Sequence, residues 1–196
     1  MAWLTPVTLC GSRVRLELLD QKHHDDLVEA THDGKLWELW YTTVPAPEGM
    51  AAEIDRRLDL FEHKSMLPFA AIDLATGMAV GMTTFMHVEE KHRRLEIGST
   101  WYRRSMQRTG FNTECKLLLL THAFESMDCI AVELRTHFMN RQSRRAIEGL
   151  GAKLDGVLRS HQVTRNGSLR DTCVYSIVAS EWAAVKKNLE FRLGQI

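Results

Sequence analysis

Apolar residues along this chain follow two different spacings. They alternate with polar residues over 13–18, and similar β-like runs cover 67–74, 78–88, 95–102, 130–136, 157–163 and 169–178. Between these runs, residues 20–31, 50–61, 112–126, 140–149 and 180–192 are predicted as helices; in the second of them apolar residues recur every three or four positions. Strands and helices are interleaved without a long linker or a repeat. The pattern predicts one mixed α/β domain that spans residues 1–196.

Short polar segments set the expected ends and pairings. Asp20 is predicted to cap the helix that follows it, and Gly34 to stop it. Asn166-Gly167 favours a tight hairpin turn between 157–163 and 169–178. Residues 78–88 and 95–102 are predicted to form another hairpin. Strict alternation would give the second strand of that hairpin two faces, one with Leu95, Ile97, Ser99 and Trp101 and the other with Glu96, Gly98, Thr100 and Tyr102.

Charge and cysteine usage narrow the class of protein. Lys plus Arg and Asp plus Glu both number 25, so composition does not favour a nucleic-acid or anionic-membrane partner. The four cysteines are widely spaced and form no CxxC pair, which indicates reduced, mostly buried thiols of a cytoplasmic protein. The histidines match no metal-ligand spacing, so we expect no metal. No run approaches the roughly 20 apolar residues of a membrane span, and we expect no signal peptide.

One loop-to-helix junction has the features of an anion site. A strand ends near Tyr102, residues 107–112 form a loop, and a helix begins at once. The first N–H groups of a helix lack intrahelical partners and favour negative charge, so a pyrophosphate fits there. Gly110 allows close approach of the backbone, Asn112 tolerates left-handed geometry or caps the helix, and Arg103 and Arg108 add charge at the rim. A plain turn is the simpler interpretation, and neither GxxxxGK[ST] nor GxGxxG is present.

A second junction follows the strand at 130–136. Asn140 and Ser143 occupy the first turn of the next helix, which closes at Gly149 or Gly151. The local pattern is explained if Asn140 is only an N-cap and Ser143 a surface residue. The alternative is that the two polar groups face a ligand.

Together the two segments carry a resemblance that covers residues 13–178. The chain resembles the GNAT-superfamily acetyltransferases, in the branch that includes the ribosomal-protein N-terminal (alanine/serine) acetyltransferases. The residues that carry it are the loop Gln107-x-x-Gly110-x-Asn112, the helix start Thr113-Glu114-x-Lys116-Leu117, and the segment 134–152.

The resemblance implies an α/β (α+β) fold with a central, mostly antiparallel sheet that is splayed open and flanked by helices on both faces. Acetyl-CoA (coenzyme A) would lie in the split as cosubstrate. Backbone groups near Trp101 and Tyr102 would pair with its pantetheine arm, residues 107–113 with its pyrophosphate, and Asn140 with the arm near the thiol. The implied cofactor-binding residues are Trp101, Tyr102, Arg103, Gln107, Arg108, Thr109, Gly110, Phe111, Asn112, Thr113, Asn140 and Ser143.

The implied reaction is N-acetyl transfer to a primary amine by direct attack. It needs a base for the ammonium, a donor for the thioester oxygen and a proton for the leaving thiolate. The resemblance gives Ser143 the last role and a backbone N–H near Tyr102 the second. Some relatives carry a Glu about nineteen positions after the Ser, but Gln162 stands there, so Glu96 and then His161 are the candidate bases.

The acceptor is less defined. Trp37, Trp40 and Tyr41 are predicted on a short helix, either as core or as an apolar wall of the acceptor site. The acceptor is expected to be a small-molecule amine or a protein N-terminus, and a homodimer is common among relatives. Two other functions are compatible with the sequence: a non-catalytic coenzyme A-binding module, and a phosphate loop for another nucleotide.

Overall fold

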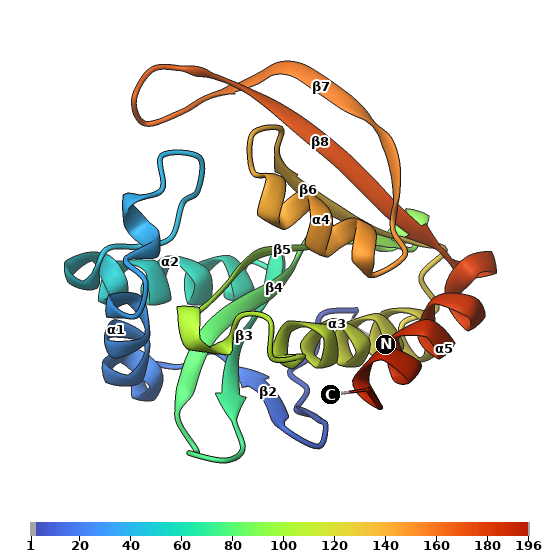
Figure 1. Cartoon of the computed structure of the whole chain (residues 1–196), viewed down its shortest axis with the longest axis horizontal. Coiled ribbons are helices and arrows are strands. Elements are labelled where there is room, and N and C mark those ends of the chain that lie inside the picture. The colour runs from blue at the N-terminus through green and yellow to red at the C-terminus, as the bar shows by residue number, and fades with distance from the viewer. Residues whose placement is uncertain (1–2, 196) are drawn as a thin grey trace.

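The computed structural model describes residues 3–195 and is built on one eight-stranded sheet (Figure 1). Its order is β1-β2-β3-β4-β5-β6-β8-β7, and every neighbouring pair is antiparallel except β5 with β6. This confirms the predicted fold class. The strands are Leu9–Cys10 (β1), Val14–Leu18 (β2), Met66–Asp73 (β3), Ala79–Glu89 (β4), Arg94–Tyr102 (β5), Ala131–His137 (β6), Lys153–Val163 (β7) and Leu169–Val178 (β8).

Helices cover both faces of the sheet, as expected. One core lies between the sheet and α1 and α2, and a larger one lies between the sheet and α3 and α5. The β7–β8 hairpin arches above the molecule toward the connection between α1 and α2 (Figure 1). The helices are His24–His32 (α1), Met50–Glu62 (α2), Phe111–Thr121 (α3), Arg141–Gly149 (α4) and Trp182–Leu193 (α5).

The sheet opens between its two parallel strands. β5 pairs with β6 only over Arg94–Glu96, opposite 131–133. Beyond these three pairs β5 continues with β4 alone, and β6 continues with β8 alone. The edges of β5 and β6 therefore diverge into a wedge, which is the splay that the sequence resemblance implied.

A bulge in β5 lies at the mouth of this wedge. Thr84 pairs with Gly98 and Met82 with Trp101, so β5 has one more residue than β4 between the two pairs. Ser99 has φ +48°, in the left-handed region. An extra residue reverses the alternation of faces. The expectation that Glu96 and Tyr102 share a face is therefore wrong: Tyr102 packs in the same core as Leu95 and Ile97.

The α3 segment differs from its prediction at both ends. Gly110 is the N-cap, with φ +88°, and Asn112 lies inside the first turn, so Asn112 does not cap the helix. The α-helix ends at Thr121 and continues as a π-helix, His122–Ser126, in which the Met127 N–H donates to the His122 carbonyl. Periodicity does not distinguish a terminal π turn from an α turn, because both extend the same apolar run.

The aromatic segment after α1 is not the predicted short helix. A 3-10 helix covers only Leu36–Glu38, and Leu39 is extended, so Trp40 and Tyr41 lie in a following turn. Other expectations fare better: Asp20 caps the 3-10 helix Gln21–His23 that leads into α1, and the hairpin turns at Asn166-Gly167. β7 begins at Lys153, four residues before the predicted start.

The expectation of mostly buried thiols is met. All four cysteines are free, and three of them, Cys115, Cys129 and Cys173, are buried. Within residues 3–195, no helix combines the length and apolar character of a membrane-crossing segment.

Candidate functional site

The start of α3 presents free backbone donors. Gly110 and Arg108 both have positive φ, and the N-cap residue Gly110 provides no side-chain cap. The Phe111 N–H has a long hydrogen bond to Thr109 Oγ1, at 3.4 Å. The N–H groups of Asn112 and Thr113 also come at a helix end where intrahelical acceptors are lacking. The helix dipole adds partial positive charge at this end. The turn has the donors and the charge that a diphosphate requires.

Long-range contacts fix the loop in this shape. The buried Glu114 carboxylate accepts hydrogen bonds from the Ser12 N–H and hydroxyl and from the Arg13 N–H. The Arg13 guanidinium in turn donates to the Thr109 carbonyl at 3.3 Å. The two residues just before β2 thus hold the loop from behind, which explains why Glu follows Thr113 in the helix start.

Gln107 links the loop to two other elements. Its Nε2 donates to the Tyr102 carbonyl at 3.3 Å, and its Oε1 accepts from Gln142 of α4 at 2.8 Å. The side chain therefore organises the loop rather than facing outward. Sequence reasoning missed Gln142, because nothing in the pattern of α4 indicates a partner 35 residues away.

The two arginines at the rim have different environments. Arg103 Nε donates to Asp33 at 3.1 Å, and hydrogen bonds from Ser105 and Arg103 lower the pKa of that Asp33 carboxyl. The charge of Arg103 is therefore compensated by the carboxylate that follows α1. Arg108 is exposed beside the loop, so of the two it is the better placed to meet a phosphate.

The aromatic side chains at the end of β5 are buried in the hydrophobic cores. Trp101 lies in the core under α1 and α2, and Tyr102 lies in the core under α3, 5.4 Å from the Phe111 ring. Burial raises the pKa of the Tyr102 phenol well above its ordinary value. Only the backbone of these two residues is available on the open edge of β5.

Asn140 is an N-cap in this structure. Its Oδ1 accepts the Ser143 N–H at 3.0 Å, which confirms the N-cap half of the structural interpretation. Ser143 is half-buried in the first turn of α4. The cap fixes the start of α4 directly after β6, at the far side of the wedge from the α3 loop.

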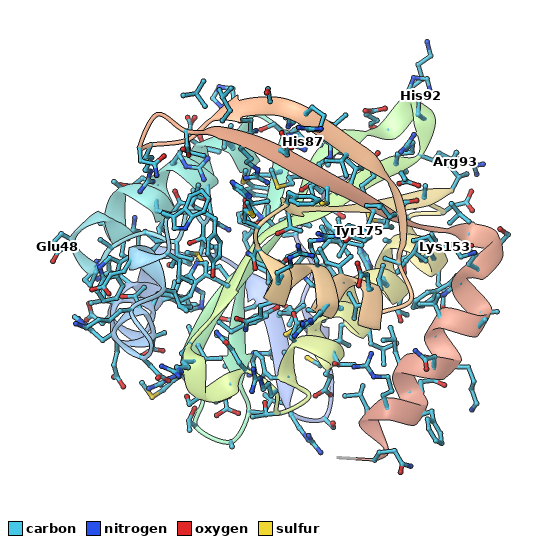
Figure 2. The ribbon with its side chains drawn as sticks, turned by 45° about the horizontal axis from the view of Figure 1, so that its top comes forward. Glu48, His87, His92, Arg93, Lys153 and Tyr175 are labelled. Atoms are coloured by element: carbon cyan, nitrogen blue, oxygen red, sulfur yellow. The ribbon has the colours of Figure 1, made fainter. Side chains whose placement is uncertain are left out.

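Glu96 is the last β5 residue paired with β6, and the residue is 6% exposed. His87 Nδ1 of β4 lies 2.8 Å from the Glu96 carboxylate, and Arg135 Nε of β6 lies 3.4 Å from it. His87 itself is exposed (Figure 2). The carboxylate is therefore ion-paired yet linked to solvent through an imidazole. Sequence reasoning missed His87, which a second β4 irregularity at φ +46° turns toward Glu96.

His161 occupies a different strand. Two extra residues bulge from β7 between Leu158 and Gln162, and Asp171 holds them by accepting hydrogen bonds from Arg159 Nε and the Ser160 N–H. His161 Nδ1 lies 3.1 Å from Thr172 Oγ1. β6 and β8 separate this strand from β5, so Glu96 and His161 lie on strands that are not neighbours in the sheet.

Trp40 and Tyr41 converge on a residue that sequence reasoning did not single out as functional. Their rings lie 5.1 and 6.4 Å from the His137 ring at the end of β6. Trp40 is 51% exposed, so it is not core. Trp37 points elsewhere and contacts His32. The structure therefore brings two of the three predicted acceptor residues to the wedge.

His137 is 5% exposed and its protonation is constrained. Nδ1 accepts the Met139 N–H at 3.0 Å, so the ring proton of the neutral form lies on Nε2. Burial and the nearby Arg170 lower its pKa. Among the described side chains, Nε2 has no hydrogen-bond partner. A buried donor without a partner close to the wedge is suited to a substrate oxygen.

Comparison with known proteins decides the family. The sequence matches the family described as "Acetyltransferase (GNAT) domain" over residues 13–153. The chain belongs to the GNAT acetyltransferase family. Its likeness to solved GNAT-type structures extends over nearly the whole chain: a GCN5-related N-acetyltransferase from Brucella melitensis is 31% identical with a TM-score of 0.84, covering 94% of this chain and 84% of that one.

Two further relatives of this GNAT domain agree. A structure from T. thermophilus with a provisional acetyltransferase assignment is 31% identical, with a TM-score of 0.84, and the match covers 97% of this chain and 99% of that one. Bacillus subtilis (strain 168) YdaF, whose name carries a provisional assignment as a ribosomal N-acetyltransferase, is 28% identical over 113 residues. That alignment covers 58% of this chain and 61% of YdaF, so the match spans less than two thirds of that relative.

Proposed function

We propose that this GNAT domain transfers the acetyl group of acetyl-CoA to a primary amine, by direct attack in a ternary complex. One observation carries the proposal. A helix start without a side-chain cap, at Gly110, lies at one end of the wedge that opens between β5 and β6. The helix start provides an anion site, and the adjoining wedge provides room for an extended chain attached to that anion.

The residues present fit coenzyme A. The amides of 111–113 would hold the diphosphate, with Arg108 beside them, and the open backbone edge of β5 at Trp101 and Tyr102 would pair with the amide-bearing arm as an added strand does. Thr109 and Gly110 shape the loop, and Asn140 and Ser143 at the start of α4 would contact the arm near the thiol. When bound, acetyl-CoA supplies a thioester as the acetyl donor.

The protein's own groups then divide the chemistry. An amide of β5 beyond the Ser99 bulge donates to the thioester oxygen. Ser143 protonates or hydrogen-bonds the leaving sulfur, and Glu96 accepts the ammonium proton and passes it to solvent through His87, 2.8 Å away. His161 is the second candidate for the base.

The acceptor amine enters from the side of Trp40, Tyr41 and His137. Their rings form a partly exposed wall, and the His137 Nε2–H would donate to an oxygen near the amine. A protein N-terminus, whose amine is followed by a carbonyl, provides such an oxygen, and so does an amino-acid amide. A cytoplasmic location and a homodimer stay predictions.

The test is a thiol-release assay with acetyl-CoA across peptide N-termini, amino-acid amides and simple alkylamines. The proposal expects release that depends on acceptor and is fastest for amines with a neighbouring carbonyl. Binding of coenzyme A without release for any amine would identify a non-catalytic coenzyme A-binding module instead. Displacement of acetyl-CoA by ATP would identify a site for another nucleotide.

A further inference from the structure

One buried cation outside the loop and the candidate catalytic residues reaches the β5 bulge. Arg57 of α2 is only 3% exposed. Its Nε donates to Glu53 at 2.7 Å, one terminal nitrogen to the Thr84 hydroxyl at 2.8 Å, and the other to the Ser99 carbonyl at 3.2 Å. The guanidinium thus joins β4 and β5 at the bulge residue itself.

The bulge needs such support. Ser99 has φ +48°, which is unfavourable for a residue with a side chain. At the neighbouring Gly98, a Cβ would lie 2.6 Å from Met86 Sδ and 2.7 Å from Glu96 Oε1. The backbone is therefore both strained and closely packed here, and strain of this kind is kept only where the surroundings over-determine it.

A second buried cation holds the opposite face. Lys116 of α3 is 4% exposed and donates to Thr100 Oγ1 at 2.8 Å and to Thr83 Oγ1 at 3.2 Å. The two hydroxyls also share a hydrogen bond at 2.7 Å. Side chains from α2 and from α3 therefore fasten the same pair of strands from the two sides of the sheet.

We propose that Arg57 is a positioning residue for acetyl transfer: by gripping the Ser99 carbonyl, it fixes the bulge and so aims the β5 amides beyond it at the thioester. The inference rests on the proposed function, because it presumes that those amides face the acetyl donor. In a trans peptide unit the carbonyl and the next N–H point in opposite directions. Holding the Ser99 carbonyl toward α2 therefore fixes the direction of the Thr100 N–H.

The bulge also decides which amides reach the open edge. Backbone N–H groups alternate between the two edges of a strand, and one extra residue shifts that alternation for every residue after it. A β5 that lost the bulge would turn a different set of amides toward the wedge. Arg57 would act through this geometry and would not touch the reacting atoms.

The test compares Arg57→Met with Arg56→Met. Arg56 is the adjacent residue and donates to the same Glu53 carboxylate, but it is half-exposed and contacts no strand in the hydrogen bonds described. We expect Arg57→Met to lower kcat about 100-fold, the scale of losing one oxyanion donor. Coenzyme A affinity should fall by a much smaller factor than kcat, because the α3 loop that would hold the diphosphate is untouched, and Arg56→Met should stay within about twofold of the unmodified protein.

Isotope-edited infrared spectroscopy gives a readout that a merely structural role would not move. With acetyl-CoA labelled at the thioester carbon and no amine present, the carbonyl band should lie at higher frequency in Arg57→Met than in Arg56→Met, because the hydrogen bond to the oxygen is weakened. Equal kcat and equal band positions in the two variants would overturn the inference.

If Arg57→Met does not fold, Arg57→Lys decides. Lysine keeps a charge beside Glu53, but it lacks the planar guanidinium whose two terminal nitrogens reach Thr84 and Ser99. A lower kcat in Arg57→Lys, with the carbonyl band again at higher frequency, supports the inference. A kcat equal to that of the unmodified protein overturns it. Absence of thiol release in the unmodified protein would instead contradict the proposed function, so the two failures are distinguishable.

Discussion

For Ser143, an effect on the chemical step can be told apart from an effect on coenzyme A binding by a single substitution. Its N–H is held by the Asn140 cap, so replacing the hydroxyl leaves the start of α4 intact. We expect Ser143→Ala to lower kcat by about 100-fold, the lower end of the range for loss of a general acid, while the Kd for coenzyme A changes little. Steady-state kinetics with calorimetric titration of coenzyme A measures both. Unchanged turnover would remove Ser143 from the mechanism.

The base can be assigned by a pH–rate comparison of Glu96→Gln and His161→Ala. Loss of the base removes the fall of kcat/KM on the acidic side, because no group is left whose protonation stops the reaction. Since Glu96 lies at the apex of the wedge, we expect Glu96→Gln to abolish that limb and His161→Ala to keep it. The opposite pattern would assign His161, and two unchanged limbs would favour a water chain or the substrate itself.

Sequence reasoning at this scale reached the loop residues and the Asn140-x-x-Ser143 spacing, because their types have local meanings. It placed Glu96 on the same face as Tyr102, since alternation cannot reveal a bulge whose extra residue, Ser99, is held by Arg57 from another element. His137 was not identified for the same reason: its neighbours Trp40 and Tyr41 come from a distant turn.

At the scale of the element, the junction into α3 makes the sharpest prediction. Gly110 has φ +88°, and an alanine there is strained. We expect Gly110→Ala to weaken coenzyme A binding about tenfold, equivalent to about 1.4 kcal/mol, because relief of the strain moves the amides of 111–113. Calorimetric titration of coenzyme A measures the change.

Gly77 is the matched control for this prediction. It also has positive φ, at +76°, in the β3–β4 turn, and a Cβ there would meet no atom within 4 Å. Gly77→Ala carries a similar backbone cost but should leave the affinity for coenzyme A unchanged. Equal losses of affinity in the two variants would mean that the α3 turn has no special part in binding.

Most helices and strands were predictable, because amphipathic spacing and Asp20, Gly34 and Asn166-Gly167 give local signals. The segment from Leu36 to Tyr41 was not. Aromatic residues at spacings of three and four suggested a helix, but the extended Leu39 ends it after Glu38. The two-residue strand β1 is also too short for any periodicity to show.

At the scale of the whole molecule, Lys116 links stability to pH. Burial lowers its pKa from 10.5 to about 8 in the folded protein. Between these values the unfolded chain binds more protons than the folded one, so this group makes stability rise as pH increases from about 8 to 10.5. A pKa difference of this size corresponds to about 3 kcal/mol of unfolding free energy.

The measurement is urea unfolding of the unmodified protein and Lys116→Met at a series of pH values. We expect the free energy of unfolding of the unmodified protein, minus that of Lys116→Met, to increase as pH rises across this window. The Cys115 thiol, whose pKa burial raises to about 12, is common to both proteins and cancels in the difference. Parallel curves would show that Lys116 titrates normally.

The splay came from the family resemblance, not from periodicity, and the order of the strands was not predicted. Alternation predicts which residues form strands, yet it does not state that β5 meets β6 in parallel for three pairs and then diverges.

The central claim is that the amides of 111–113 and the wedge between β5 and β6 hold one cofactor along a single path. A crystal structure with coenzyme A bound tests it most directly. The account predicts the diphosphate on the α3 turn, the arm against the β5 edge at Trp101 and Tyr102, and the sulfur near Ser143. Coenzyme A bound elsewhere, with the turn and the wedge empty, would contradict it.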